Sequence, residues 1–116
     1  MNTSTSCKRS LTLISDLGLK PNDLTEIINI FNKNPNVIKA VVFGSRAKGD
    51  YKIYSDVDIA IYGAVDINEI EKIICDLDDL PLIYKFDVVA RGLIKNRALC
   101  EHIDRVGVTI YERSIV

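Results

Sequence analysis

Apolar residues recur at the 3.6-residue period of a helix in three parts of the chain. The first runs from Pro21 to about Lys33. The second begins after Asp66, which we expect to cap a helix together with Glu69, and stops before Pro81. The third covers residues 93–104. These three stretches predict three amphipathic helices.

Short β-branched runs lie between the helical stretches and predict strands. The predicted strands are residues 37–43, 56–62, 82–89 and 108–112. Residues 44–55 read as a loop with one helical turn at Arg46–Lys48, and residues 11–20 read as a short helix or turn. The alternation predicts an α/β (α+β) fold, with a small mixed β-sheet of about four strands and helices packed on one face.

The composition limits the class of protein. The chain has 116 residues, 47% of them hydrophobic, with a formal net charge of −1, which suits one globular domain and disfavours a nucleic-acid-binding module. We expect residues 1–10 to be a disordered polar tail and residues 11–116 to be a single domain. The three cysteines form no CxxC pair, and no apolar run is long enough to span a bilayer. The start lacks the pattern of a secretory signal, so we expect a cytoplasmic protein.

Two aspartates interrupt the second predicted strand. Side chains alternate across a strand, so Asp56 and Asp58 share one face, while the apolar residues between and after them face the core. The third predicted strand places Asp87 on its polar face. Like charges on one face repel, whereas a hard divalent cation prefers carboxylate oxygens. The pattern indicates a metal site.

A Gly-Ser pair, Gly44 and Ser45, ends the first strand ten residues before the aspartates. Glycine lets a backbone approach a phosphate closely, and serine adds a hydroxyl beside free backbone N–H groups. Arg46 and Lys48 could add cationic donors. Phosphates next to bound metal ions are what phosphoryl or nucleotidyl transfer requires.

The string Phe43-Gly44-Ser45, ten residues, then Asp56-Val57-Asp58-Ile59 resembles the hG[GS]-x(9–13)-[DE]-h-[DE]-h signature of the DNA polymerase beta-like nucleotidyltransferase superfamily. The length is similar to that of its minimal nucleotidyltransferase (MNT) family of antitoxin type. The resemblance runs from about Leu24 to the last strand.

The resemblance implies a nucleotidyltransferase fold and a role for each motif residue. Gly44, Ser45 and Arg46 would bind the nucleotide, and Asp56, Asp58 and Asp87 would be catalytic and hold Mg²⁺, with two ions expected. ATP would be the substrate, and AMP would pass to a hydroxyl. The implied acceptor is a tyrosine of a small helical HEPN-type toxin encoded nearby.

Two other functions stay open at this point: a small-molecule nucleotidyltransferase of the aminoglycoside-modifying kind, and an inactive antitoxin that inhibits by binding. The pattern does not decide the acceptor atom, the base or the oligomeric state. It also leaves open the roles of five further residues, which are Lys48, Tyr51, Tyr54, Arg91 and His102.

Overall fold

The computed structural model describes residues 17–49, 51–52 and 55–113. The predicted tail at residues 1–10 lies outside these ranges. The described elements are, in chain order, α2 (Pro21–Asn32), β1 (Val37–Phe43), α3 (Ser45–Lys48), β2 (Val57–Gly63), α4 (Ile67–Asp78), β3 (Phe86–Ala90), the 3₁₀ turn η1 (Arg91–Leu93), α5 (Arg97–Val106) and β4 (Val108–Glu112).

The strands form one mixed four-stranded sheet in the order β3-β2-β1-β4. β1 is antiparallel to both of its neighbours, β2 and β4, whereas β2 and β3 are parallel. A parallel pair needs a crossover connection, and α4 supplies it. The predicted mixed α+β sheet is confirmed, with β3 at one edge and β4 at the other.

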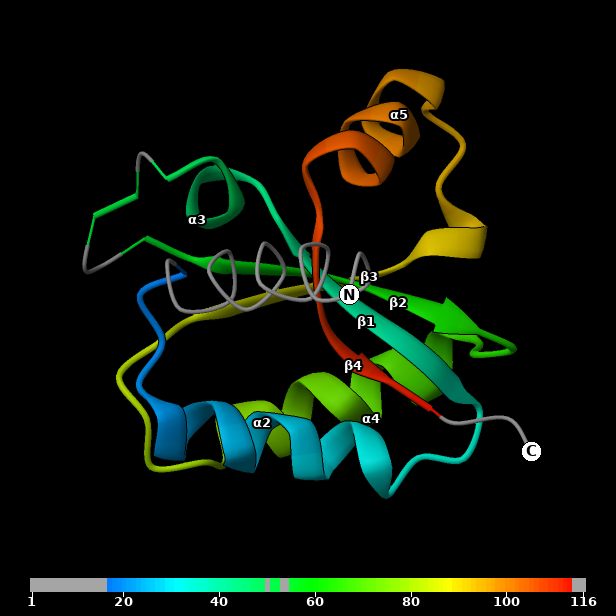
Figure 1. Ribbon diagram of the computed structural model, residues 1–116. Coiled ribbons are helices and arrows are strands. Elements are labelled where there is room, and N and C mark those ends of the chain that lie inside the picture. Colours follow the sequence, from blue (N-terminus) through cyan, green and yellow to red (C-terminus); the bar gives the residue numbers. More distant parts are fainter. Residues whose placement is uncertain (1–16, 50, 53–54, 114–116) are drawn as a thin grey trace, which may run out of the picture.

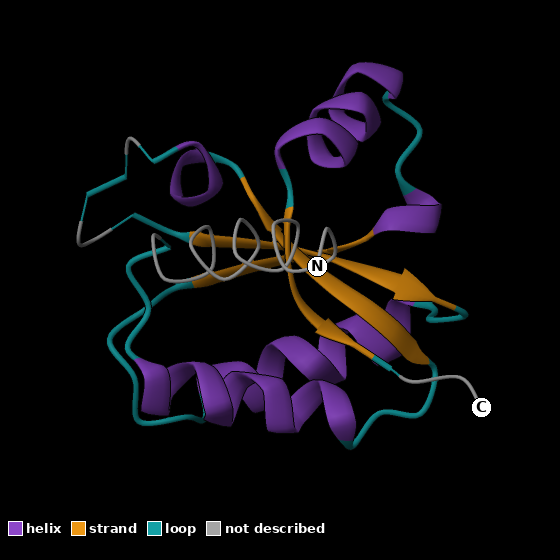
Figure 2. Cartoon of the chain, viewed as in Figure 1, coloured by secondary structure: helices purple, strands orange, loops and turns teal. Residues whose placement is uncertain are grey.

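Helices cover both faces of the sheet, not one as predicted. α2 and α4 lie side by side against one face, where the larger apolar core is formed (Figure 1). α5 lies on the opposite side of the sheet, where Ile103 packs with Val41, Phe43 and Ala60 (Figure 2). The apolar stripe of α5 is short, so its pattern could not show which face it would cover.

Strong local signals set several boundaries as predicted. β1 covers the expected residues 37–43. Asp66 accepts from the Glu69 N–H, and the Glu69 carboxylate accepts from the Asp66 N–H, which completes the predicted capping box of α4.

The third strand is shorter than predicted, because β3 begins at Phe86 and not at residue 82. The hydroxyl of Tyr84 donates to Asp23 Oδ2 (2.8 Å), and this bond ties the segment before β3 to the start of α2. The third helix also begins later than predicted, because Asn96 caps it by accepting from the Leu99 N–H.

Among the described residues, no helix has both the length and the apolar character that crossing a bilayer requires.

Candidate active site

Two carboxylates face each other across neighbouring strands. In the parallel pairing of β2 with β3, Asp58 is the register partner of Asp87. The residues on either side of Asp58, Val57 and Ile59, are fully buried in the core on the other face. Strand alternation therefore places both carboxylates on the face opposite α2 and α4.

Asp56 belongs to the same acidic group. It is exposed and lies just before β2, two residues from Asp58. The pKa of Asp58 is raised above its ordinary value, first by burial and then by the negative charges of Asp87 and Asp56. Keeping all three carboxylates charged is therefore unfavourable unless a positive charge offsets them.

Gly44 brings the phosphate-type turn into contact with this acidic group. Phe43 pairs with Asp58 across β1 and β2. Gly44 has a φ of 76°, and a Cβ added to it would lie 2.2 Å from Asp58 Oδ2. Only glycine fits there without moving the carboxylate. Ser45 follows as the first residue of α3 and is partly exposed.

Arg46 does not have the environment expected of a phosphate-binding group. It is only 2% exposed. Its guanidinium donates to the carbonyls of Leu17 (2.9 Å) and Ser55 (3.0 Å) and lies over the rings of Tyr51 and Tyr84. These contacts give Arg46 a part in the framework of the site, and its predicted part in nucleotide binding stays a prediction.

The other residues left undecided by the sequence have varied surroundings. Lys48 is exposed on α3, and Tyr54 lies outside the described residues. The His102 ring packs edge-on against Phe43, with 6.4 Å between centroids. Arg91 pairs with Asp104 of α5 (3.0 Å), and this contact lowers the pKa of Asp104. Arg91 thus helps to hold α5.

The donor set suits Mg²⁺, which prefers a few carboxylates together with phosphate oxygens over an all-protein cage. The described part of the chain contains no group of three or more acidic, histidine or cysteine side chains arranged to hold a metal ion by themselves. Asp56, Asp58 and Asp87 would hold the ion once a nucleotide supplied the remaining oxygens.

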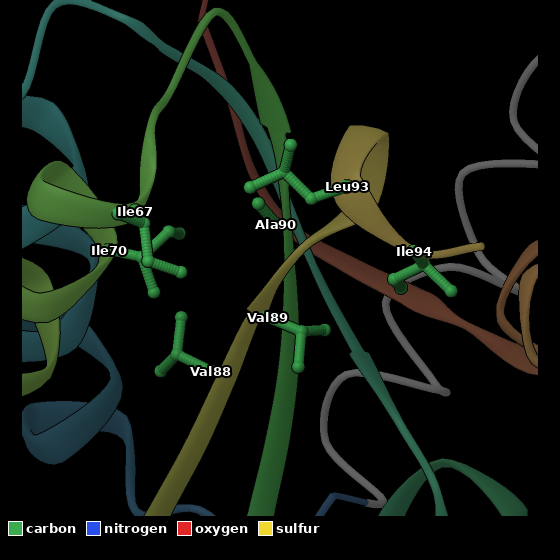
Figure 3. Close-up of a pocket in the computed structure, with 7 residues that line it drawn as sticks. All are labelled: Ile67, Ile70, Val88, Val89, Ala90, Leu93 and Ile94. Atoms are coloured by element: carbon green, nitrogen blue, oxygen red, sulfur yellow. The ribbon is translucent and has the colours of Figure 1, made fainter. Parts of the chain in front are cut away.

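A separate apolar pocket of about 240 Å³ lies beside β3. Figure 3 shows its lining, which comes from the start of α4, the end of β3 and the turn that follows (Ile67, Ile70, residues 88–90, Leu93 and Ile94). No sequence pattern indicates this pocket, because an isoleucine at the start of a helix gives the same pattern whether it lines a pocket or packs in a core.

A mixed sheet with a Gly-Ser turn against paired carboxylates is typical of enzymes that transfer phosphoryl or nucleotidyl groups. The model of the family described as Polymerase beta, Nucleotidyltransferase matches residues 25–115, so the chain belongs to this family and is a nucleotidyltransferase.

Several solved structures share the fold. A toxin–antitoxin complex with AMP-PNP matches with a TM-score of 0.66 and 23% identity, over 78% of this chain and 74% of the other. A tri-AMPylated HEPN toxin of Shewanella oneidensis in complex with MNT antitoxin matches with a TM-score of 0.63 and 20% identity, over 82% and 74%. No curated protein matches the chain. At these identities the likeness establishes a common fold.

Proposed function

We propose that this chain is an MNT-type antitoxin that transfers AMP from ATP, with Mg²⁺, to a tyrosine hydroxyl of a HEPN-type partner in the cytoplasm. The observation that carries the proposal is the register pairing of Asp58 with Asp87, with Gly44 in contact with Asp58. The structures that share the fold support the choice of nucleotide and partner, since they include AMP-PNP and an AMPylated HEPN toxin.

The reaction balances as a single displacement. The acceptor oxygen bonds to the α-phosphorus, the bond from that phosphorus to the bridging oxygen breaks, and pyrophosphate leaves. When bound, Mg²⁺ neutralises the charge that develops on the phosphate oxygens.

The residues of the chain have separate parts in this step. Asp56, Asp58 and Asp87 would hold the metal, and the Gly44–Ser45 turn would hold the β- and γ-phosphates. Asp87 is exposed and lies on the edge strand, so an acceptor can approach it from outside the sheet. It takes the proton of the acceptor hydroxyl.

The test is transfer of label from α-³²P-ATP to the product of the adjacent gene, which the proposal expects to be a HEPN-type protein. We expect the parent chain to label it and the Asp58→Asn variant to be slower by at least about 100-fold, because the metal clamp acts mainly in the transition state. Changing the acceptor tyrosine to phenylalanine is the control.

Two results would contradict the proposal. Equal labelling by the Asp58→Asn variant would remove the catalytic role of this aspartate. Neutralisation of the toxin by stoichiometric binding without any label would favour an antitoxin that acts by binding alone.

A further inference from the structure

The edge strand β3 carries a surface that the proposed chemistry does not use. Among the described residues, β3 pairs with a strand on one side only. The pocket of about 240 Å³ lies along this strand and takes side chains from both faces of it, Val88 and Ala90 from one face and Val89 from the other.

Exposed apolar side chains gather at the same edge. Four large hydrophobic residues of the described chain are exposed, and two of them, Ile67 (60%) and Leu93 (54%), line this pocket. A third, Ile83, lies three residues before β3 and is 75% exposed. Figure 3 shows Ile67 and Leu93 on opposite sides of the pocket, with Ile67 at the start of α4 and Leu93 in the turn after β3.

The pocket and one carboxylate of the candidate active site lie on the same strand, β3. Asp87, the second residue of the strand, belongs to the acidic group, and the pocket begins at the next residue. The three-residue step from Asp87 to Ala90 spans about 10 Å of extended chain. A segment of another protein that lies along the free edge of β3 and places a hydroxyl at Asp87 therefore also passes the pocket, within a few of its own residues from that hydroxyl.

The charge near this edge favours a particular occupant. Residues 85–97 carry four basic side chains and one acidic one; Arg91 is paired with Asp104, and the other three basic residues, Lys85, Lys95 and Arg97, are exposed. A second copy of the chain paired about a twofold axis would place this basic segment beside its own copy, which is unfavourable. A segment with acidic residues is complementary to it.

We infer that the β3 edge and its pocket dock the acceptor-bearing segment of the protein substrate. This segment is extended, carries acidic residues and places an apolar side chain in the pocket about three residues from the acceptor hydroxyl. Strand addition supplies main-chain hydrogen bonds, and the pocket supplies selectivity. The inference rests on the proposed function for the identity of the substrate.

The test measures the Kd of the adjacent HEPN-type protein by calorimetry without ATP or metal, so that binding is separated from transfer. Leu93→Asp and Ile67→Asp place a charge at the pocket and should weaken binding at least tenfold. Ile38→Asp is the matched control, because Ile38 is also an exposed isoleucine (41%) but lies on β1. It should bind within about twofold of the parent.

Folding of the variants is checked by circular dichroism. Ile67 is the first residue of α4, where an acidic side chain is favoured, so Ile67→Asp should fold like the parent. In the labelling assay the pocket variants should raise KM for the partner and leave kcat nearly unchanged, since they remove binding and not chemistry.

The outcomes separate the docking surface from the chemistry. Parent-like binding by both pocket variants overturns the docking surface, even if labelling succeeds. Binding that depends on the pocket without labelling retains the surface and removes the transferase proposal. A homodimer that the pocket variants dissociate, with partner binding unchanged, identifies a second copy as the occupant. Absence of both binding and labelling removes both proposals.

Discussion

Replacing Gly44 by alanine should destabilise the protein through the carboxylate of Asp58. Gly44 has a φ of 76°, a conformation that costs an alanine about 1–3 kcal/mol. The added Cβ would also meet Asp58 Oδ2 at 2.2 Å, so the carboxylate must move, at a further cost of about 1 kcal/mol or more. We expect Gly44→Ala to lower the free energy of unfolding by about 2–4 kcal/mol.

A double-mutant cycle separates the two contributions. In the Asp58→Ala background the nearest remaining atom of that residue is its Cβ, at 3.5 Å, an ordinary contact. The backbone cost then remains and the steric cost disappears. Gly44→Ala should therefore be less destabilising there, with a coupling energy of about 1 kcal/mol.

Urea unfolding followed by circular dichroism measures all four proteins. Gly49→Ala is the control, because Gly49 has a φ of 87° and open space where a Cβ would be added. Its cost of about 1–2 kcal/mol should not depend on residue 58. A coupling energy between residues 44 and 58 below about 0.5 kcal/mol would refute the contact on which the site is built.

Two further predictions concern the framework and the charge of the site. Arg46→Met should cost about 2–4 kcal/mol in urea unfolding, because buried carbonyls lose their donor, whereas Lys48→Met, exposed on the same helix, should change stability by less than about 0.5 kcal/mol. Asp58 binds its proton more tightly in the folded state, so stability should fall as pH rises from its ordinary pKa of 3.8 through the raised value. Asp58→Asn should flatten that fall and raise the free energy of unfolding at pH 7 by roughly 0.5–1 kcal/mol, after allowance for solvent screening. A steeper fall of stability with pH in the variant would contradict the charge assignment.

The sequence predicts best where a signal is local. The β-branched run at 37–43 and the capping box at Asp66 need no distant partner, and both are confirmed. The start of β3 depends instead on Tyr84, whose hydroxyl bonds to Asp23, 61 residues away. The alternation before β3 is compatible with a strand, but the Tyr84 hydroxyl also accepts from the Lys20 N–H (3.3 Å), so long-range contacts hold this segment near the start of α2.

The same distinction applies to the candidate site. Alternation correctly places Asp58 and Asp87 on one face, because each lies in its own strand between apolar neighbours. Their direct pairing depends on the register of two parallel strands, and no local signal sets that register. Arg46 shows another limit of the sequence. A basic residue after a Gly-Ser pair has the pattern of a phosphate ligand, and its burial is visible only in the structure.

Burial of Arg46 also explains how the two halves of the motif are held together. Arg46 follows the Gly44–Ser45 turn, and its guanidinium donates twice to the carbonyl of Ser55, the residue before Asp56. The bonds join the turn to the start of the acidic strand across the intervening loop. A metal ion can bind a phosphate and the carboxylates together only if the turn and the carboxylates keep a fixed separation, so these bonds of Arg46 contribute to the geometry of the site. Its loss should then reduce transfer even under conditions where the variant remains folded.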